Sequence, residues 1–552
     1  MNILGINYGG HDTSAALLKN GKLVAACEEE RYCGDKHTRD FPKNAINDCL
    51  KIASLEISDI DVVSFSYKPS ILLKASGQVR KMRRDLPSEK EYVRILKEQI
   101  GYDGDVDFNH HHLCHVASSY YPSGFDTALL YSNDGIGETH CSMMAMAVNG
   151  EIKVIHKGNP WPNSLGLFYS AITFYLGWKP MCDEGIVMGL APLGNSRETI
   201  PNTDKRYIDV FREMVNVNGY DIEINKKWFS FHKERDKFVS DEFISMFGPL
   251  KKWEDEITDN HKNIAAALQD RLEEIVLEQL TLLRKEYEVD KLCISGGVGL
   301  NCSLNGKIES KNIFDEIFVP PASGDNGTSI GAAYLSLSRR GKVEIGKYHD
   351  FFLGHRQTDE EIKSFLDREE ITYVEADEAF SLVSQRLEEG KIIGWVQGGA
   401  EFGPRALGNR SILAKPFPSA IKDHVNARVK FREAFRPFAP SVLAEEAREW
   451  FEIRYDSPHM LRAVQCREDK VEDIGAVIHV DNSARVQTVH SLNPRYRTLI
   501  ETFNKQTGYP ILLNTSFNVK GQPIVNDCED AYKCFMSTNI DVLVVGKYII
   551  EK

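Results

Sequence analysis

The beginning of the chain alternates apolar runs with short turns. A glycine-rich turn at residues 9–12 separates the first two runs, and Asn20-Gly21 separates the second run from the third. Asn-Gly between two apolar runs favours a type I′ hairpin, because both residues tolerate the positive φ angles of that turn. The pattern predicts a compact β-meander with strands at 2–7, 13–18 and 22–27.

The same order of runs and turns recurs between residues 126 and 157. The run DTALLYSN leads into the turn 134–137, and CSMMAMAV leads through Asn149-Gly150 into EIKVIH. Two copies of one supersecondary pattern indicate a duplicated unit. We therefore expect two related half-domains.

Two further predicted strands each run into a glycine turn. An amphipathic helix precedes the strand KLCIS and the turn Gly296-Gly297, and the strand EIFVPP precedes the turn 324–327 and a helix rich in small residues. Backbone N–H groups at such turns can face phosphates, so both turns are candidate nucleotide contacts, although either alone is a common feature. The apolar stripe of the first helix consists of Ile264, Leu268, Leu272, Val276, Leu280 and Leu283.

Two changes in the pattern mark the domain organisation. Residues 195–262 are polar, carry interspersed aromatic side chains and follow neither the helix nor the strand period, so we interpret them as an insert that covers the site. Near residues 345–357 the pattern breaks and a new α/β unit begins, which predicts one domain at 1–348 and another at 357–552. The new unit starts with a helix, a strand, a second helix and a second strand at 358–367, 371–376, 380–390 and 391–399.

Composition and charge narrow the class of protein. With 552 residues, of which 42% are hydrophobic and 27% charged, the chain has globular composition but is too long for one hydrophobic core. A net charge of −13 argues against a nucleic acid partner. No secretory leader or membrane-length apolar run is present, so we expect a cytoplasmic protein with no membrane partner. The 11 cysteines lack metal-type spacing and are expected to be reduced thiols.

The histidine-rich segment NHHHLCHV is a candidate metal site. If Asn109 caps a short helix, His111 and His115 lie at i and i+4 on one face, where two imidazoles can bind one ion. Asp134 and Asp325, each beside a glycine turn, are the natural additional ligands, and such a set favours iron, zinc or manganese over calcium. The alternative is a hydrogen-bonded histidine patch without a metal.

The C-terminal region embeds several cations in apolar sequence, within EFGPRALGNRS, ARVKFREAFRPFAP, SARVQTV and LLNTSFN. A guanidinium in such surroundings is costly to desolvate unless it meets an anion, and its planar fork fits phosphate oxygens. The pattern indicates a phosphate pocket. The alternative is that Arg405, Arg436 and Arg485 pair with carboxylates such as Glu401 or Glu433.

Taken together, these motifs resemble the O-carbamoyltransferase family, which includes the nodulation carbamoyltransferases and the tobramycin and cephamycin carbamoyltransferases. The motifs that carry the resemblance are HHxxxH, EGxVMGLAP, SGGVxLN, GPRALGNRS, FRPFAP, ARVQTV and LNTSFN. The resemblance implies an α/β protein with two domains. The N-terminal domain is expected to have the duplicated fold of the actin and sugar-kinase superfamily, and the C-terminal α/β domain to be similar to the enzyme that makes threonylcarbamoyl-adenylate.

The resemblance also implies a reaction. The C-terminal domain hydrolyses carbamoyl phosphate to carbamate, which passes internally to the N-terminal site and attacks ATP, giving carbamoyl-adenylate and pyrophosphate. A hydroxyl group of a small glycoside or natural-product acceptor then displaces AMP. The implied cofactors are ATP with magnesium as co-substrate and one divalent transition metal, iron first, with zinc or manganese as alternatives.

Carried over by motif, the site residues fall into four groups. The metal ligands are His111, His115, Asp134 and Asp325, and His11 and Lys36 are catalytic residues near the adenylate and the acceptor. The nucleotide-binding residues are Lys36, Gly135, Gly296, Gly297, Asn301 and Asp325. The carbamoyl phosphate pocket consists of Arg405, Lys430, Arg436, Arg485, Asn514 and Ser516, with Arg405 and Arg485 as catalytic residues.

Other functions share parts of this pattern. A sugar-kinase-like phosphotransferase would release ADP rather than AMP and pyrophosphate, and a non-catalytic regulatory ATPase would have no use for the C-terminal cations. Modification of tRNA is disfavoured by the acidic charge. The sequence indicates no oligomeric state.

Overall fold

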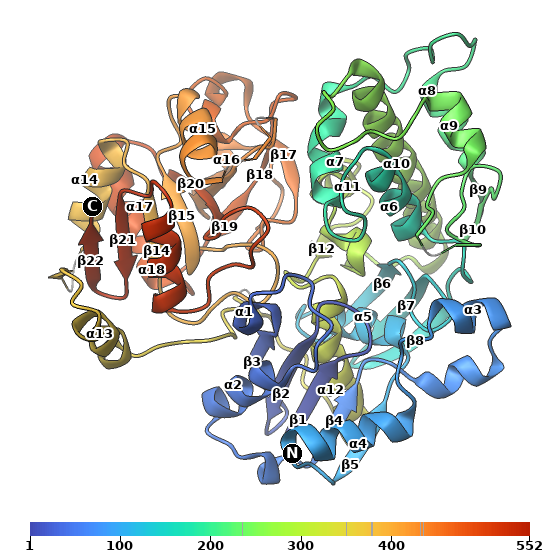
Figure 1. Cartoon of the computed structure of the whole chain (residues 1–552), viewed down its shortest axis with the longest axis horizontal. Helices are drawn as coiled ribbons and strands as arrows, with labels where there is room; N and C mark the ends of the chain where they lie inside the picture. Colours follow the sequence, from blue (N-terminus) through green and yellow to red (C-terminus); the bar gives the residue numbers. More distant parts are fainter. Residues whose placement is uncertain (235, 349, 377–378, 431, 434) are drawn as a thin grey trace. The chain divides into compact units, whose positions relative to one another are not determined.

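The computed structural model of the chain describes residues 1–234, 236–348, 350–376, 379–430, 432–433 and 435–552. Figure 1 draws the described chain, which divides into two compact units. The first unit comprises Met1–Val63, Gln99–Gly104 and Tyr348–Lys552, and the second comprises Ser64–Glu98 and Asp105–Lys347.

The N-terminal meander forms as predicted. Strands β1 (Ile3–Asn7), β2 (Ser14–Lys19) and β3 (Lys22–Glu28) pair antiparallel in sequence. Asn20 and Gly21 have φ angles of 52° and 78°, the two positive values that a type I′ turn requires. The sheet has the order β3-β2-β1-β4-β5, with β4 at Val62–Phe65 and β5 at Asp105–Phe108.

A second sheet repeats this topology. Its meander consists of β6 (Thr127–Asn133), β7 (Ser142–Val148) and β8 (Glu151–His156), with the positive-φ pair Asn149-Gly150 in the last turn. The order is β12-β11-β6-β7-β8, so the later strands β11 (Lys291–Ser295) and β12 (Glu316–Phe318) lie beside the first meander strand, as β4 and β5 do in the first sheet. The predicted duplication is confirmed.

Helices of the second unit bring the candidate site together. Helix α5 (His111–Tyr120) packs against α12 (Thr328–Ser338) so closely that a Cβ at Gly331 would lie 1.9 Å from the Cys114 carbonyl oxygen. Helix α10 (Asp259–Tyr287) carries the predicted apolar stripe, and all six of its side chains are buried. Other helices in this part of the chain are α1 (Glu30–Cys33), α2 (Lys43–Ala53), α3 (Gly77–Met82), α4 (Glu89–Ile100), α6 (Leu165–Tyr175), α7 (Glu184–Leu190) and α11 (Cys302–Ser310).

The polar segment 195–262 is structured. It contains α8 (Tyr207–Met214), the hairpin of β9 (Val215–Asn218) and β10 (Asp221–Ile224), and α9 (Asp241–Phe247). Phe211, Trp228 and Phe243 are buried, which accounts for aromatic residues in an otherwise polar sequence. Its role as a cover for the site stays a prediction, as does the domain boundary between 348 and 357.

The C-terminal region is built on an eight-stranded mixed sheet, so the α/β class is confirmed. Its strand order is β13-β22-β21-β14-β15-β20-β16-β19. The strands are β13 (Val374–Glu375), β14 (Ile393–Val396), β15 (Arg410–Ala414), β16 (Ala439–Leu443), β19 (Gln487–Val489), β20 (Ile511–Ser516), β21 (Val542–Val545) and β22 (Tyr548–Glu551), and β17 (Ala463–Gln465) pairs separately with β18 (Ser483–Arg485).

Helices bury both faces of this sheet. Alternate side chains of β14 enter different cores, Trp395 on one side and Val396 on the other, as the strand period of two requires. Helices α14 (Phe380–Glu388) and α17 (Pro494–Thr507) cover the Trp395 side, and α13 (Asp359–Arg368) and α18 (Cys528–Ser537) cover the other. Two short helices, α15 (Ala420–Val425) and α16 (Ala447–Trp450), complete the region.

Candidate functional site

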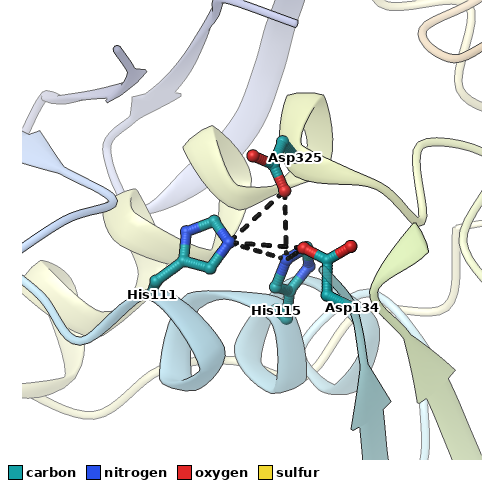
Figure 2. A group of neighbouring side chains, drawn as sticks. All are labelled: His111, His115, Asp134 and Asp325. Atoms are coloured by element: carbon teal, nitrogen blue, oxygen red, sulfur yellow. Dashed lines mark hydrogen bonds and ion pairs between the residues drawn. The ribbon is translucent and has the colours of Figure 1, made fainter. Parts of the chain in front are cut away.

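Four predicted metal ligands meet in the second unit. His111 and His115 project from one face of α5, Asp134 follows the end of β6, and Asp325 begins the short turn that leads into α12 (Figure 2). Both imidazoles are fully buried. Figure 2 shows the four side chains converging from these three elements.

The spacing of their donor atoms fits a single ion. His115 Nε2 lies 3.1 Å from His111 Nε2 and 3.2 Å from Asp134 Oδ2, and His111 Nε2 lies 3.3 Å from Asp325 Oδ1. The two cross distances are 3.5 and 3.6 Å. Four ligands about 2.1 Å from a tetrahedral ion are about 3.4 Å apart. Two imidazoles and two carboxylates at this spacing suit iron, zinc or manganese.

The same contacts shift the pKa values of His111 and Asp134. Burial lowers the pKa of His111, but the carboxylates of Asp325 and Asp134 outweigh burial and raise it to about 10. Burial and the Asp325 charge raise the pKa of Asp134, but contacts with His111 and His115 outweigh them and lower it below its ordinary value. The Asp134 carboxylate therefore stays ionised, as a metal ligand must be.

A buried carboxylate, rather than Asn109, holds the start of α5. The side chain of Glu138 is 0% exposed and accepts hydrogen bonds from the His111 N–H at 3.1 Å and from the Lys68 N–H at 2.8 Å. The prediction that Asn109 caps the helix is wrong, because its amide donates to Ser64 Oγ and the Phe65 carbonyl, both at 2.9 Å. A carboxylate at the positive end of the helix fixes both imidazole-bearing turns. Glu138 was missed by the sequence reasoning, because it is separated from α5 in the chain.

Tyr67 is a second residue that the sequence reasoning missed. Its ring stacks on His111 with centroids 4.3 Å apart and planes inclined by 9°. Its hydroxyl donates to Asp325 Oδ2 at 3.1 Å. Tyr67 therefore fixes the ring of one ligand and the carboxylate of another.

His112 has a structural place in this segment. Its ring contacts the His140 carbonyl oxygen at 2.9 Å and Ser132 Oγ at 3.2 Å. Burial and the neighbouring imidazoles lower the pKa of His112 well below its ordinary value. His112 therefore has a neutral ring with hydrogen bonds to both nitrogens. For this histidine alone, the structure agrees with the alternative of a hydrogen-bonded patch without a metal.

The predicted glycine turns lie against Asp134. Gly135 follows it in the chain, and the Gly297 N–H donates to Asp134 Oδ1 at 3.1 Å. Gly296 has a φ of 84°, and a Cβ there would lie 2.2 Å from the Asn133 carbonyl oxygen, so only glycine fits. Asn301 instead caps α11 and exchanges two hydrogen bonds with Gln269. Its side-chain amide is thus engaged, and nucleotide binding by these residues stays a prediction.

In the first unit, His11 belongs to a histidine pair joined by one carboxylate. Asp12 contacts Nδ1 of His11 at 2.7 Å and Nδ1 of His37 at 2.6 Å. Burial raises the pKa of Asp12, but the two imidazoles outweigh it and lower the pKa below its ordinary value. Glu30 accepts the His37 backbone N–H at 2.8 Å. Asp12 and His37 were missed, since His37 is distant from the GGHD segment in the chain.

The C-terminal cations gather around Lys430 in the first unit. Its buried ammonium donates to the Ser516 carbonyl, to Ser516 Oγ at 3.2 Å and to Asn518 Oδ1 at 2.8 Å. Burial, then Arg432 and other cations that include Arg436 and Lys36, lower the pKa of Lys430 well below its ordinary value. The structure therefore brings the charge of the exposed Lys36 within reach of this pocket.

Arg432 is a further cation that the sequence reasoning did not single out. It donates to Asn426 Oδ1 at 3.0 Å, and its guanidinium lies 4.4 Å from the Phe438 ring centroid. Burial, then Arg436 and Arg485, lower the pKa of Arg432 well below its ordinary value. Like charges held this closely concentrate positive potential, which an anion relieves.

The carboxylate-pairing alternative holds for part of the pocket. Arg436 approaches Glu433, with Nη1 3.7 Å from Oε2. Glu401 instead accepts three backbone N–H groups, from Leu407, Asn409 and Arg410, and so fixes the loop that presents the half-buried Arg405.

Asn514 also has a structural place. Its amide donates to the Ala406 carbonyl, Ser441 Oγ and Gln487 Oε1 at 3.0 to 3.1 Å. These bonds tie β20 to the loop that carries Arg405. Direct contact of Asn514 with a ligand stays a prediction.

Among the described residues, no helix is both long and apolar enough to span a membrane.

Two models of known protein families together match nearly the whole chain. The family described as "Carbamoyltransferase N-terminus" matches residues 2–334, and "Carbamoyltransferase C-terminus" matches 384–552. The chain is 35% identical to the uncharacterized protein sll1178 of Synechocystis, over 100% of this chain and 96% of that protein. It is 36% identical to nodulation protein NolNO of Sinorhizobium fredii, over 98% and 79%.

Two further matches are partial. The 3'-hydroxymethylcephem-O-carbamoyltransferase of Streptomyces clavuligerus is 36% identical over 52% of this chain and 53% of that enzyme. Among solved structures, component A of the Acidaminococcus fermentans (R)-2-hydroxyglutaryl-CoA dehydratase matches 61% of this chain and 98% of its own, with 16% identity and a TM-score of 0.34.

Proposed function

Because the chain belongs to the carbamoyltransferase family and is an enzyme of that class, we propose that it transfers a carbamoyl group from carbamoyl phosphate, through an ATP-derived adenylate, to a hydroxyl group of a small molecule. The observation that carries this proposal is the presence, in one chain, of a dense cation pocket and a separate cluster of two imidazoles and two carboxylates. A phosphate-releasing half and a nucleotide-dependent half would need these two different environments.

The cation pocket suits the donor half. In the proposed step, water attacks the carbonyl carbon of carbamoyl phosphate, the bond from that carbon to the bridging oxygen breaks, and phosphate and carbamate are formed. Lys430, Arg432, Arg436 and Arg485 supply positive charge where the leaving phosphate gains negative charge. Arg405, on the loop held by Glu401, completes the proposed set.

The nucleotide half follows from the carbamate product. A carbamate oxygen attacks the α-phosphorus of ATP, pyrophosphate leaves, and the carbamoyl carbon becomes linked to AMP through a mixed anhydride. The acceptor hydroxyl then attacks that carbon, and the bond to AMP breaks. In this step His11, oriented by Asp12, takes the hydroxyl proton.

A transition metal fits the cluster on α5, since the donors have the spacing and chemistry that such an ion requires. When bound, it supplies Lewis-acid stabilisation of phosphate or carbonyl oxygens. His111, His115, Asp134 and Asp325 would hold it, and Glu138 and Tyr67 keep these ligands in place. Iron is our first choice of metal, with zinc and manganese as alternatives.

Metal content should depend on the histidine pair. We expect about one transition metal ion per purified wild-type chain, and loss of most of it when both His111 and His115 are replaced by alanine. Elemental analysis measures this directly. His156→Ala, which removes a histidine paired with the exposed Asp221, is the matched control and should keep the metal. Equal metal in the double variant and wild type contradicts the proposed site.

Lys36 should contribute to turnover. We expect Lys36→Ala to lower the rate of carbamoyl transfer about tenfold or more, because a cation in contact with the nucleotide or its carbamoyl adduct supports a charged intermediate. Steady-state kinetics with ATP as the varied substrate measure the effect. Lys22→Ala, an exposed change on β3, is the control. Unchanged ATP KM and turnover in Lys36→Ala would mean that the side chain only faces solvent.

Product analysis tests the function as a whole. The enzyme should be incubated with ATP, carbamoyl phosphate and a panel of hydroxylated glycosides and natural products, and mass spectrometry should find one added carbamoyl group. AMP, pyrophosphate and phosphate are the expected co-products. ADP with a phosphorylated acceptor would establish the sugar-kinase alternative instead.

A further inference from the structure

Arg83 lies beside the α5 cluster without belonging to it. It follows α3 directly, and its guanidinium carbon is 5.0 Å from the ring centroid of Tyr67. Tyr67 in turn stacks on His111 and donates to Asp325. A single aromatic ring therefore separates this cation from two of the candidate metal ligands.

One edge of the Arg83 guanidinium is buried without hydrogen bonds. Both Nε and Nη2 are inaccessible to solvent and have no hydrogen-bond partner among the described residues. These two atoms form the edge through which arginine binds carboxylate or phosphate in bidentate fashion. Burial lowers the pKa of Arg83, but Tyr67 and the charges of Asp325 and Glu138 outweigh it and raise the pKa. The group is thus a partly buried cation whose Nε and Nη2 edge lacks a hydrogen-bond acceptor.

Charge balance alone does not account for this arrangement. Glu138 already accepts the N–H groups of His111 and Lys68, and Asp325 accepts the Tyr67 hydroxyl. Within the described chain, no carboxylate lies close enough to Arg83 to form an ion pair. The neighbouring charges favour the cation, but its Nε and Nη2 make no hydrogen bond, and buried donors without an acceptor cost stability until an acceptor such as an anion binds them.

We propose that the Nε and Nη2 edge of Arg83 binds a phosphate group of the adenine nucleotide at this centre. The inference rests on the proposed function, in which the nucleotide is the anionic substrate of this half. An uncharged acceptor hydroxyl has no need of a cation, whereas phosphate oxygens match the planar fork. Arg83 is therefore a nucleotide-specificity residue that no motif of the sequence indicates.

The test compares ligands with and without phosphate. AMP and adenosine are titrated calorimetrically into the metal-loaded full chain, as wild type, Arg83→Gln, Arg83→Lys and the control Arg80→Gln, which changes an exposed arginine of α3. We expect Arg83→Gln to weaken AMP binding about tenfold or more, with adenosine affinity and metal content unchanged. Arg83→Lys should lie between, since it keeps the charge and loses the fork.

Four outcomes overturn the inference. Wild-type AMP affinity in Arg83→Gln, or equal losses for AMP and adenosine in both Arg83 variants, would show that the guanidinium only packs against Tyr67. Loss of metal with AMP affinity retained would show that it balances the ligand charges. A wild-type chain that binds neither AMP nor ATP defeats the proposed function together with this inference, whereas the first three results leave the function standing.

Discussion

Replacement of Arg485 by alanine should abolish phosphate release from carbamoyl phosphate, with a loss of about 100-fold or more. Arg485 stands at the end of β18 and adds its charge to that of Arg432 and the cations around it. The leaving phosphate gains negative charge as its bond breaks, and a preorganised guanidinium in a partly dehydrated pocket stabilises that charge far more than water does.

The same variant should keep the nucleotide half intact. In the proposed mechanism, metal content and adenine nucleotide binding depend on the α5 cluster, whose ligands contact one another within the second unit, whereas Arg485 belongs to the first unit. Conversely, His111→Ala should still release phosphate from carbamoyl phosphate but lose formation of AMP and pyrophosphate. Because free carbamate is short-lived in water, a mixture of the two variants should restore little product.

A phosphate-release assay and a pyrophosphate assay on each variant measure this separation. Arg497→Ala, which removes a surface arginine paired with Glu445, is the control for loss of a guanidinium in the same region. Before these assays, the midpoint of thermal unfolding should be compared between Arg497→Ala and Arg485→Ala. Hydrolysis of carbamoyl phosphate by Arg485→Ala at the wild-type rate would show that the proposed division of labour is wrong.

Replacement of Asp12 by asparagine should lower carbamoyl transfer about 100-fold, the scale of a general base that is no longer oriented. Asp12 contacts Nδ1 of both His11 and His37, and this contact fixes which ring nitrogen carries the proton. The asparagine amide accepts through its oxygen but donates through its nitrogen. It therefore cannot keep the proton on the same ring nitrogen of both His11 and His37. Asp12 has a φ of 55°, which asparagine also tolerates, so the backbone should be preserved.

The effect should fall on kcat rather than on the acceptor KM, because Asp12 acts through His11 and not on the substrate. The pH profile of kcat should lose its rising limb, and Asp12→Glu should restore part of the rate. Asp221→Asn, at an exposed contact with His156, is the control. A variant with normal kcat and an unchanged pH profile would assign Asp12 to structure alone, and His11 would then need another source of orientation.

Local patterns predicted the elements that depend on neighbours in the chain. The two meanders follow from apolar runs joined by Asn-Gly, because the positive φ angles at Asn20-Gly21 and Asn149-Gly150 are a property of the turn itself. Helix α10 follows from one apolar stripe, since every residue of the stripe enters the core. His111 and His115 share a face because four residues make about one helical turn.

The sequence by itself thus determined the duplicated α/β architecture, the family, and the donors on α5. The tertiary structure alone decided what surrounds them. Glu138 rather than Asn109 holds the start of α5, Tyr67 locks His111 and Asp325, and Arg432 joins the C-terminal cations. Most of these contacts join residues that are far apart in the sequence. Which partner a polar group binds depends on the distance, burial and charge of the groups around it in the folded chain. No spacing along the sequence encodes which partner prevails.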